Sequence, residues 1–372
     1  MAVTPSPVLL SGGLLSADLA TIVIGRKLDP VDYALVQVDG YAHGYVTHAT
    51  CTGLRSAPQS TATGAIVHAL PDDERARVCF YAAVIGSTPR QAVVDGVTVS
   101  LFAFDAKTAD KFTEYDQVDW ADIWAPLAFE VAKEVMEHKG LRDAVAVNAI
   151  LKGMILRASA RLRAQAAPNR AQQFSGRVDI LDQRLSYADF FALKDYRVQP
   201  GLFPGGLAHP QKRAVFLAMD AAIVLPYDPR RDRVLLVEQM RMGPLARGET
   251  NPWQFEPVAG HVDPGETPEQ AAIREAKEEA GLDISTLEPI AQCYPSPGAS
   301  SEYYYIYAAI TDLPDRGETI AGMAEEGENI RSLILDFATF MDMVETGQIT
   351  VAPLIAAAYW LLAHRPRLQR EA

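Results

Sequence analysis

Short apolar runs separated by turn residues fill residues 7–110 of the chain. The runs are PVLLSGGLL, YALVQVDGYAHGYV, ATGAIVHAL, RVCFYAAVI and GVTVSLFAF, and Gly, Pro and Asp punctuate them. Apolar runs of this length between turn residues are typical of β-strands. Residues 1–120 are therefore predicted to form a β-rich domain.

The spacing of apolar positions changes to a helical period after residue 120. One stripe at three- and four-residue intervals comprises Trp124, Leu127, Ala128, Val131 and Val135. A second helix is expected over residues 141–165, and a polar, basic tail containing Pro168 follows it. Residues 121–170 are therefore predicted to be a helical connector between two domains.

Strand-like and helix-like patterns alternate over residues 171–372. The strand-like runs are GRVDILDQRLSYADFFALKDYRV, DAAIVLPYD, DRVLLVEQMR, LEPIAQCYPSPGASSEYYYIYAAI and RSLILDF, and the last helical run is VAPLIAAAYWLLAHRPRL. This alternation predicts a second, mixed domain, so the fold class of the whole chain is α+β.

Composition narrows the choice of function. A length of 372 residues suits two domains, and a net charge of −13 argues against a general nucleic-acid-binding surface. The three cysteines are too few and too widely spaced for a disulfide framework or a zinc site. The opening residues have no basic leader, and the run VAPLIAAAYWLLA is too short to span a bilayer. We therefore expect a cytoplasmic protein with no nucleic-acid or membrane partner.

The segment GHVDPGETPEQAAIREAKEEAGL, residues 260–282, carries start and stop signals for a helix. Thr267 can cap the first turn, Pro268 suits the first helical position, and Gly281 suits the end. An apolar stripe along this helix is predicted at Ile273, Ala276 and Ala280.

Three carboxylates lie on one face of that predicted helix. Glu275 and Glu279 are four residues apart with Glu278 between them, and like charges at this spacing repel. One interpretation is a solvated acidic face with Arg274 and Lys277 as partners. The other is a site for a hard divalent cation, because Mg²⁺ prefers oxygen ligands and bridges to substrate phosphates.

The spacing matches the Nudix box, G-x5-E-x7-R-E-U-x-E-E-x-G-U, in which U is apolar. The fixed positions are filled by Gly260, Glu266, Arg274, Glu275, Glu278, Glu279 and Gly281. Ala276 and Leu282 fill the apolar positions. The segment therefore resembles Nudix hydrolases. This resemblance implies an α/β/α sandwich with a mixed sheet, and Mg²⁺- or Mn²⁺-dependent hydrolysis of a nucleoside diphosphate linked to another moiety.

The resemblance also implies the metal ligands. By position in the box, Glu275 and Glu279 would bind the metal, and the backbone carbonyl of Ala259 would complete its shell. Glu266 would be an ancillary ligand.

Further catalytic groups follow from the same resemblance. Glu278 would lie close to the metal, and Arg274 would hold the carboxylates by charge-assisted hydrogen bonds. The family takes its general base from a loop after the box, and here that loop is MAEEGENI. Glu326 matches the base and Glu328 an additional metal ligand. Without its context this segment would be interpreted as a mobile acidic loop.

A second motif narrows the substrate. In YPSPGASSE, residues 294–302, Pro297 lies 16 residues after Gly281 and precedes Gly298. This arrangement resembles the ADP-ribose pyrophosphatases, and the resemblance extends over residues 176–365. It implies hydrolysis of ADP-ribose to AMP and ribose 5-phosphate. The alternatives are another nucleoside diphosphate sugar, such as GDP-mannose, and a sensor that binds ADP-ribose without turnover.

The subfamily resemblance also suggests substrate contacts. Arg241 is the candidate for the substrate diphosphate because a guanidinium is a fork donor. Glu256 and Glu302 are candidates for the ribose or the adenine side, and Phe191 or another aromatic residue of YADFFALKDYRV is a candidate for stacking on adenine. In this family the strand around Phe191 is often exchanged between subunits, which implies a homodimer.

Residues 8–15, VLLSGGLL, resemble the opening of the γ-glutamyl cyclotransferase-like fold, a barrel. That family begins Y-G-(S/T)-L, whereas this chain has Ser11, Gly12, Gly13 and Leu14 and lacks the Tyr. Ile85 stands where that family has its catalytic Glu. The resemblance therefore implies a degenerate domain without that activity. An unrelated β-rich fold is the alternative.

Overall fold

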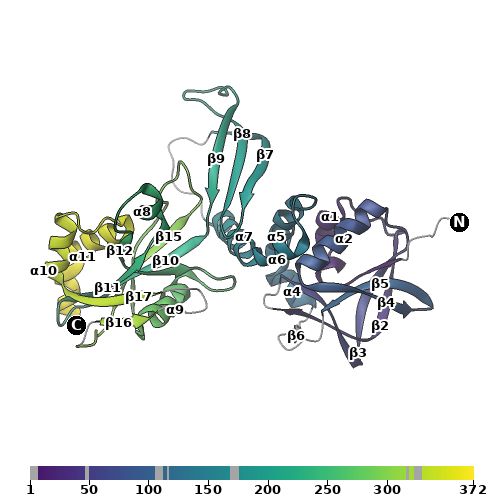
Figure 1. Cartoon of the computed structure of the whole chain (residues 1–372), viewed down its shortest axis with the longest axis horizontal. Helices are drawn as coiled ribbons and strands as arrows, with labels where there is room; N and C mark the ends of the chain where they lie inside the picture. Colours follow the sequence, from purple (N-terminus) through teal and green to yellow (C-terminus); the bar gives the residue numbers. More distant parts are fainter. Residues whose placement is uncertain are drawn as a thin grey trace. The chain divides into compact units, whose positions relative to one another are not determined.

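The computed structural model describes residues 7–46, 50–104, 112–114, 117–167, 176–315, 318–321 and 329–372 (Figure 1). The chain divides into two compact units. The first comprises Met1–Ala171 and Ala188–Phe190, and the second comprises Gln172–Tyr187 and Phe191–Ala372. The helices of residues 121–167, predicted as a connector, thus belong to the first unit.

The first unit contains a six-stranded sheet in the order β4-β5-β1-β3-β2-β6. Its strands are β1 (Val8–Leu10), β2 (Tyr33–Val46), β3 (Thr52–Val67), β4 (Ser87–Val94), β5 (Val97–Phe104) and β6 (Phe112–Glu114). This confirms the β-rich character of the N-terminal part. Among the described strands the sheet stays open, with β4 and β6 at its edges, so the expected barrel is not formed by them.

The glycine pair expected to resemble a cyclotransferase loop is packed tightly. Gly12 and Gly13 open a 3-10 helix, η1 (Gly12–Leu15), and the Gly13 N–H donates to the Thr52 hydroxyl at 2.6 Å. A Cβ atom on Gly13 would lie 2.7 Å from that hydroxyl and 2.8 Å from Trp120. Both glycines therefore allow η1 to lie against β3. Ile85 follows α2 (Asp72–Val84) and is buried.

Helices cover the same unit. They are α1 (Ala17–Ile24), α2, α4 (Gln117–Ile123), α5 (Ala125–Glu137), α6 (Ala144–Ala149) and α7 (Leu151–Ala166), and α5 packs against α1 and α7. The predicted stripe of α5 is buried at Leu127, Ala128, Val131 and Val135. The single helix expected over residues 141–165 is instead two. Asp143 caps the first by accepting from the Ala146 N–H at 2.8 Å, and Ile150 leaves the helical conformation between them.

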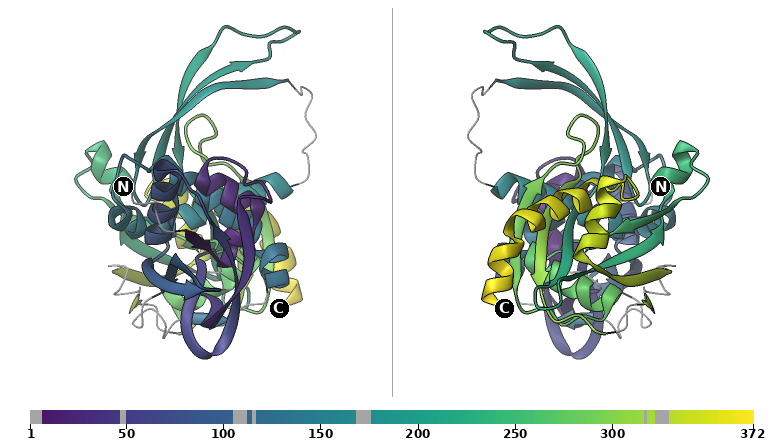
Figure 2. Two further views of the ribbon diagram at one scale, coloured as in Figure 1. Left: turned by 90° about the vertical axis from the view of Figure 1, so that its right-hand side faces the viewer. Right: turned by 90° about the vertical axis from the view of Figure 1, so that its left-hand side faces the viewer.

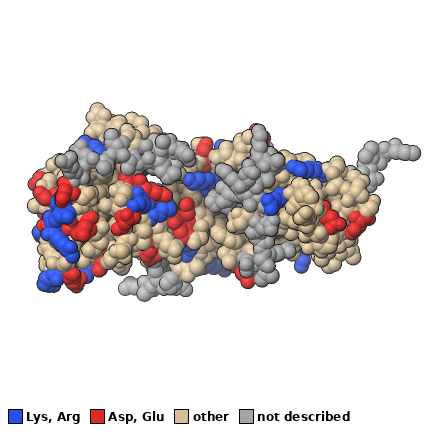
Figure 3. Space-filling model, turned by 90° about the horizontal axis from the view of Figure 1, so that it is seen from below, with Lys and Arg blue, Asp and Glu red and all other residues tan. Residues whose placement is uncertain are grey.

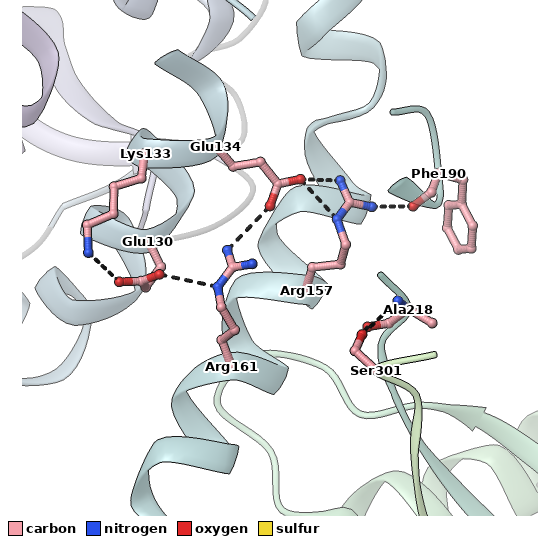
Figure 4. Close-up of polar contacts among 8 residues, drawn as sticks. All are labelled: Glu130, Lys133, Glu134, Arg157, Arg161, Phe190, Ala218 and Ser301. Atoms are coloured by element: carbon pink, nitrogen blue, oxygen red, sulfur yellow. Dashed lines mark hydrogen bonds and ion pairs between the residues drawn. The ribbon is translucent and has the colours of Figure 1, made fainter. Parts of the chain in front are cut away.

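A buried ion network joins α5 and α7 (Figure 4). The Arg157 side chain is 1% exposed, and its Nε donates to Glu134 Oε1 at 2.9 Å. Its Nη1 donates to the backbone carbonyl of Phe190 at 2.5 Å. Arg161 bridges Glu134 and Glu130 at 3.3 and 3.2 Å. A guanidinium this deeply buried is tolerated only because its charge and its donors are matched.

The second unit contains a mixed eight-stranded sheet, as predicted. The path is β14-β15-β10-β11-β17-β16, with β12 beside β11 and β13 beside β10. Among the described strands of this sheet, β10 and β15 are the only parallel pair. The strands are β10 (Asp220–Asp228), β11 (Arg233–Met240), β12 (Trp253–Glu256), β13 (Val258–His261), β14 (Leu287–Cys293), β15 (Tyr303–Ile310), β16 (Glu318–Ala321) and β17 (Ile330–Asp336).

Helices cover both faces of this sheet (Figures 1 and 2). The helix α9 (Pro268–Ala280) packs on one face over a core that includes Ala222, Val224 and Val258. On the other face, α10 (Phe337–Glu345) and α11 (Ala352–Glu371) pack over Ile223, Leu225 and Ile306. This confirms the predicted α/β/α arrangement. A short helix, α8 (Met242–Arg247), links β11 to β12.

A separate antiparallel sheet precedes the mixed one. It has the order β7-β8-β9, with β7 (Val178–Ala188), β8 (Ala192–Pro200) and β9 (Gln211–Leu217). Its exposed apolar side chains include Val178, Ile180, Leu193 and Phe216, and Phe191 in the bend before β8 is exposed as well. Within the ranges given above, none of the helices combines the length and apolar character that a membrane crossing requires.

The buried ion pair yields a stability prediction. Glu134→Ala leaves the Arg157 charge buried without its carboxylate, so the unfolding free energy should fall by about 3–5 kcal/mol. Chemical denaturation of the purified protein measures this. The double variant Glu134→Leu with Arg157→Met, which removes both charges, should lose less.

The matched control is Glu249→Ala, whose partner Arg247 has a side chain that is 79% exposed. Loss of an exposed pair should change stability by less than about 1 kcal/mol. Equal, small effects of Glu134→Ala and Glu249→Ala would contradict the structural importance of the buried network.

Candidate active site

The helix α9 begins and ends where the sequence predicts. Thr267 accepts a hydrogen bond from the Gln270 N–H at 3.3 Å, and the Gln270 side chain accepts from the Thr267 N–H at 2.8 Å. These two bonds form a capping box. Gly281 ends the helix in the left-handed conformation, with φ at 67°. The carboxylates of α9 are therefore carried on a well-defined helix.

The guanidinium of Arg274 lies at the centre of the acidic groups. Nη1 contacts Glu275 at 2.6 Å and Glu278 at 3.0 Å, and Nη2 contacts Glu266 at 2.8 Å. Nη2 also donates to the backbone carbonyl of His261 at 3.0 Å. Burial alone would lower the pKa of Arg274, but the hydrogen bond to Glu266 and the charge of Glu275 raise it, so Arg274 stays a cation. One cation thus holds three of the predicted carboxylates.

Glu279 points toward the sheet and is 4% exposed. Its Oε2 accepts a hydrogen bond from the Ala259 N–H at 3.2 Å. The inward face of α9 consists of this carboxylate with Ala271, Ala272 and Ala276. The predicted apolar stripe is therefore wrong at Ile273, which is 39% exposed. Alanines occupy the inward face of α9 instead, because only small side chains fit where the helix lies close against the sheet.

Gly260 allows Glu275 to reach the sheet. A Cβ atom built at Gly260 would lie 1.9 Å from Glu275 Oε1 and 2.0 Å from its Cδ. Any side chain at residue 260 would therefore displace the carboxylate. Ala259 and Gly260 of β13 thus meet Glu279 and Glu275 of α9, which brings together the box residues expected to bind a metal.

The donor set fits a hard divalent cation. Glu279 beside Ala259 and Glu275 beside Gly260 offer carboxylate oxygens, which Mg²⁺ prefers. In the described part of the chain, no three acidic, His or Cys side chains already surround a common point for a cation. Glu326 and Glu328, together with Glu325 beside them, lie outside the described residues.

Arg241 and Glu256 form a second polar cluster. Arg241 follows β11, and its Nε and Nη2 both contact Glu256 Oε2, at 2.8 and 2.7 Å. The Arg241 side chain is 42% exposed, so a ligand can reach it. Burial raises the pKa of Glu302, while the Tyr304 hydroxyl and the charge of Arg241 lower it in part. The structure thus pairs Arg241 with Glu256 and places Glu302 and Tyr304 near enough to Arg241 for its charge to influence their pKa values.

Tyr304 was not predicted as a site residue. Its only sequence signal is its position two residues after Glu302, which can place both side chains on one side of an extended chain. The sequence YYY offers three hydroxyls on successive, opposite faces. The choice between them depends on tertiary neighbours that the local sequence does not contain.

Pro297 and Gly298 lie in an exposed turn between β14 and β15. The Ser300 N–H donates to the Ser296 carbonyl at 3.0 Å and closes this turn. The Ser301 hydroxyl accepts from the Ala218 N–H at 3.0 Å and donates to its carbonyl at 3.1 Å (Figure 4). The turn is thus tied down immediately before Glu302.

Phe191 lies against Phe216, with ring centroids 4.8 Å apart. Phe216 belongs to β9 of the three-stranded sheet, and Phe191 lies in the bend just before β8. Figure 3 shows acidic and basic side chains interspersed on one face of the second unit. Charge on that face is therefore mixed in sign.

Comparisons with known proteins agree with the geometry. Residues 217–353 match the family model of the NUDIX domain. The ADP-ribose pyrophosphatase of Escherichia coli (strain K12) is 38% identical over 194 residues, which span 52% of this chain and 92% of that protein. The ADP-ribose pyrophosphatase of Haemophilus influenzae is 33% identical over 202 residues, or 54% of this chain and 93% of that protein. The GDP-mannose pyrophosphatase of Escherichia coli (strain HS) is 30% identical over 138 residues, or 37% and 71%.

Gly260→Ala tests the contact between β13 and α9. The three atoms nearest to the new methyl group are those of the flexible Glu275 carboxylate, so the fold should persist with a loss below about 2 kcal/mol. The displaced carboxylate should weaken divalent-cation binding about tenfold or more. Calorimetric titration with Mn²⁺, beside thermal unfolding, measures both effects.

Gly243→Ala in α8 is the control, because no heavy atom lies within 4 Å of the Cβ atom it adds. It should leave Mn²⁺ binding unchanged. Unchanged binding in Gly260→Ala as well would show that Glu275 is not part of the cation site.

Proposed function

The chain belongs to the Nudix family, and we propose that it hydrolyses the diphosphate of ADP-ribose to AMP and ribose 5-phosphate. The observation that carries this proposal is the cluster of carboxylates that Arg274 gathers against Gly260. Two relatives that share 33–38% identity with the chain are ADP-ribose pyrophosphatases, which supports the choice of substrate.

A divalent cation, Mg²⁺ or alternatively Mn²⁺, would be held by Glu275, Glu279 and the Ala259 carbonyl. Glu266 and Glu328 would supply further ligands. When bound, such a cation neutralises the diphosphate, polarises phosphorus and lowers the pKa of a bound water. The carboxylates of Glu275 and Glu279 beside β13 support this assignment.

The chain's own residues would orient the carboxylates and the reacting water. Arg274 would keep Glu275 and Glu278 in place, because charge-assisted hydrogen bonds restrict both side chains. Glu278 would lie close to the reacting groups. Glu326 would be the base that takes a proton from the attacking water.

Arg241 would bind the substrate diphosphate, since a guanidinium donates to phosphate oxygens in a planar fork. Glu256 and Glu302 would accept hydrogen bonds from ribose hydroxyls, and Pro297 and Gly298 would shape the adjoining turn. The proximity of Arg241 to both carboxylates supports a single subsite that contains a phosphate donor beside hydroxyl acceptors.

Two alternatives use the same residues differently. A GDP-mannose pyrophosphatase is 30% identical over part of the chain, so another nucleoside diphosphate sugar is the second candidate substrate. A sensor that binds ADP-ribose without turnover is the third possibility. A sensor without turnover would not need to retain every carboxylate of the box. Because this chain keeps the complete set, a hydrolase is favoured over a sensor.

Glu279→Gln tests the reaction directly. The wild type with Mg²⁺ should convert ADP-ribose to AMP and ribose 5-phosphate, which chromatography separates. The variant keeps the size of the side chain but loses the charge, so its turnover should fall at least about 100-fold.

Glu269→Gln on the same helix is the matched control, because Glu269 contacts Tyr307 and none of the box residues named above. It should retain turnover. Cleavage of GDP-mannose but not ADP-ribose would overturn the substrate, and binding of ADP-ribose without cleavage of either would favour the sensor.

A second copy of the chain would cover the exposed sheet of β7, β8 and β9. Contiguous apolar side chains at a surface mark interaction sites. Phe216 of β9 contacts Phe191 in the bend before β8, and both side chains are partly exposed. These features support the homodimer expected from the sequence.

Phe216→Glu should therefore convert a dimer to a monomer, because it places a charge within an apolar interface. Light scattering on purified protein measures the mass in solution. Tyr359→Glu on α11 is the control, since Tyr359 is 51% exposed and lies on another sheet's covering helix. A monomeric wild type would rule out this interface.

A further inference from the structure

The segment just before β15 is fastened to the junction between β9 and β10. The Phe216 N–H donates to the Ala299 carbonyl at 2.8 Å, and the Ser301 N–H donates to the Phe216 carbonyl at 3.0 Å. The Ser301 hydroxyl accepts from the Ala218 N–H at 3.0 Å and donates to the Ala218 carbonyl at 3.1 Å (Figure 4). These four hydrogen bonds hold residues 299–301 in place, and one side chain makes two of them.

The Ser301 hydroxyl satisfies a buried part of the backbone. Ala218 lies between β9, which ends at Leu217, and β10, which begins at Asp220, and it is 4% exposed. A buried residue outside the strands must find other partners for its N–H and its carbonyl. A hydroxyl can accept and donate through one oxygen atom, so Ser301 supplies both partners.

The contact between Ser301 and Ala218 continues the register of the parallel strands. The two residues are 83 positions apart in the sequence. Asp220 and Tyr303, which form the first pair between β10 and β15, have the same separation. The Ser301 hydroxyl therefore extends the pairing of the two segments to a point before Glu302.

Glu302 is held on both sides by these contacts. Ser301 precedes it, and Tyr303 follows it in the ladder and is 8% exposed. The Glu302 N–H itself donates to the Ser300 hydroxyl at 3.1 Å. Register matters here because a slip of one residue turns every side chain of a strand to the opposite face.

We propose that Ser301 is a positioning residue for Glu302 in the binding of a nucleoside diphosphate sugar. Its hydroxyl fixes where β15 begins relative to β10, so that the substrate meets the Glu302 carboxylate in one orientation. This inference deepens the proposed function and rests on it, because the position of Glu302 affects binding only if its carboxylate contacts the substrate.

Ser301→Ala removes the hydroxyl and should raise KM for ADP-ribose about tenfold, the scale of one or two hydrogen bonds. The change in kcat should be much smaller, because Glu302 is expected to bind the substrate and not to take part in the chemistry. Ser301→Thr keeps a hydroxyl and should restore KM to near its wild-type value. Steady-state kinetics on the three proteins measure both constants.

Thr346 provides the matched control in the same unit. Its hydroxyl donates to the Asp342 carbonyl at 2.7 Å and accepts from the Gln348 side chain at 3.1 Å, at the end of α10. Thr346→Ala therefore also removes one donor and one acceptor, and it should leave KM unchanged. Binding of Mn²⁺ by Ser301→Ala should equal that of the wild type, because α9 and β13 keep their contacts.

A double-mutant cycle tests whether Ser301 acts through Glu302. Ser301→Ala combined with Glu302→Gln should raise KM no further than Glu302→Gln alone. Additive effects would show that the hydroxyl acts elsewhere and would overturn the proposal.

Amide hydrogen exchange without substrate keeps this inference distinct from the proposed function. In Ser301→Ala the N–H groups of Ala218 and Glu302 should exchange about tenfold faster or more, while those of α9 should not change. If Ser301→Ala is too unstable to assay, Ser301→Cys, whose thiol is a weaker donor and acceptor, should show the same changes.

Unchanged exchange, or faster exchange with an unmoved KM, would overturn the positioning role of Ser301. Failure of the wild type to bind or cleave ADP-ribose would overturn the proposed function, and with it the role of Ser301 in substrate binding. The local difference in exchange would then show only that the hydroxyl orders the segment before β15.

Discussion

The guanidinium of Arg274 lies among three carboxylates and one backbone carbonyl, and the arrangement of the site depends on this set of contacts. Without a cation between them, Glu266, Glu275 and Glu278 would repel one another and turn toward solvent. Arg274 is only partly exposed, so its hydrogen bonds are less weakened by water than those of a surface pair. The same residue also donates to the carbonyl of His261, which ties the helix to β13.

Small residues make the second contribution, because they let α9 approach the sheet. The alanines on its inward face, together with Gly260 and Ala222 beneath it, leave room for two carboxylates at the interface. Glu279 is nearly inaccessible and finds its hydrogen bond at the Ala259 N–H. A helix with larger apolar residues here would stand further from β13, and neither Glu275 nor Glu279 would reach the strand. The small side chains thus allow both the close packing of α9 on the sheet and the carboxylate site at their interface.

The local sequence was sufficient to predict α9 and the Nudix box, but not the contacts between segments that are distant in sequence. The capping residues Thr267 and Gln270 lie three apart, so their bonds follow from spacing alone. The outward position of Ile273 depends on which face of α9 meets the sheet. Apolar periodicity gave the wrong inward face, because that face contains the buried carboxylate of Glu279. The pairing of Arg241 with Glu256 depends on strand register, which no local pattern specifies. The assignment of residues 121–170 to the first unit likewise depends on the packing of α5 against α1, which composition does not show.

The parallel pairing of β10 with β15 has a consequence for how the substrate subsite is assembled. Parallel strands need a long connection, and here β11, α8, β12, β13, α9 and β14 all lie between the two partners. Arg241 and Glu256 come from the intervening chain, whereas Glu302 arrives only at the start of β15. Contacts between residues this far apart in sequence are slow to form, because loop closure costs entropy before any contact offsets it. During synthesis, a chain that has left the ribosome only as far as Leu282 would therefore contain the complete box motif but lack Glu302, so the motif and the full set of predicted substrate contacts are acquired at different times.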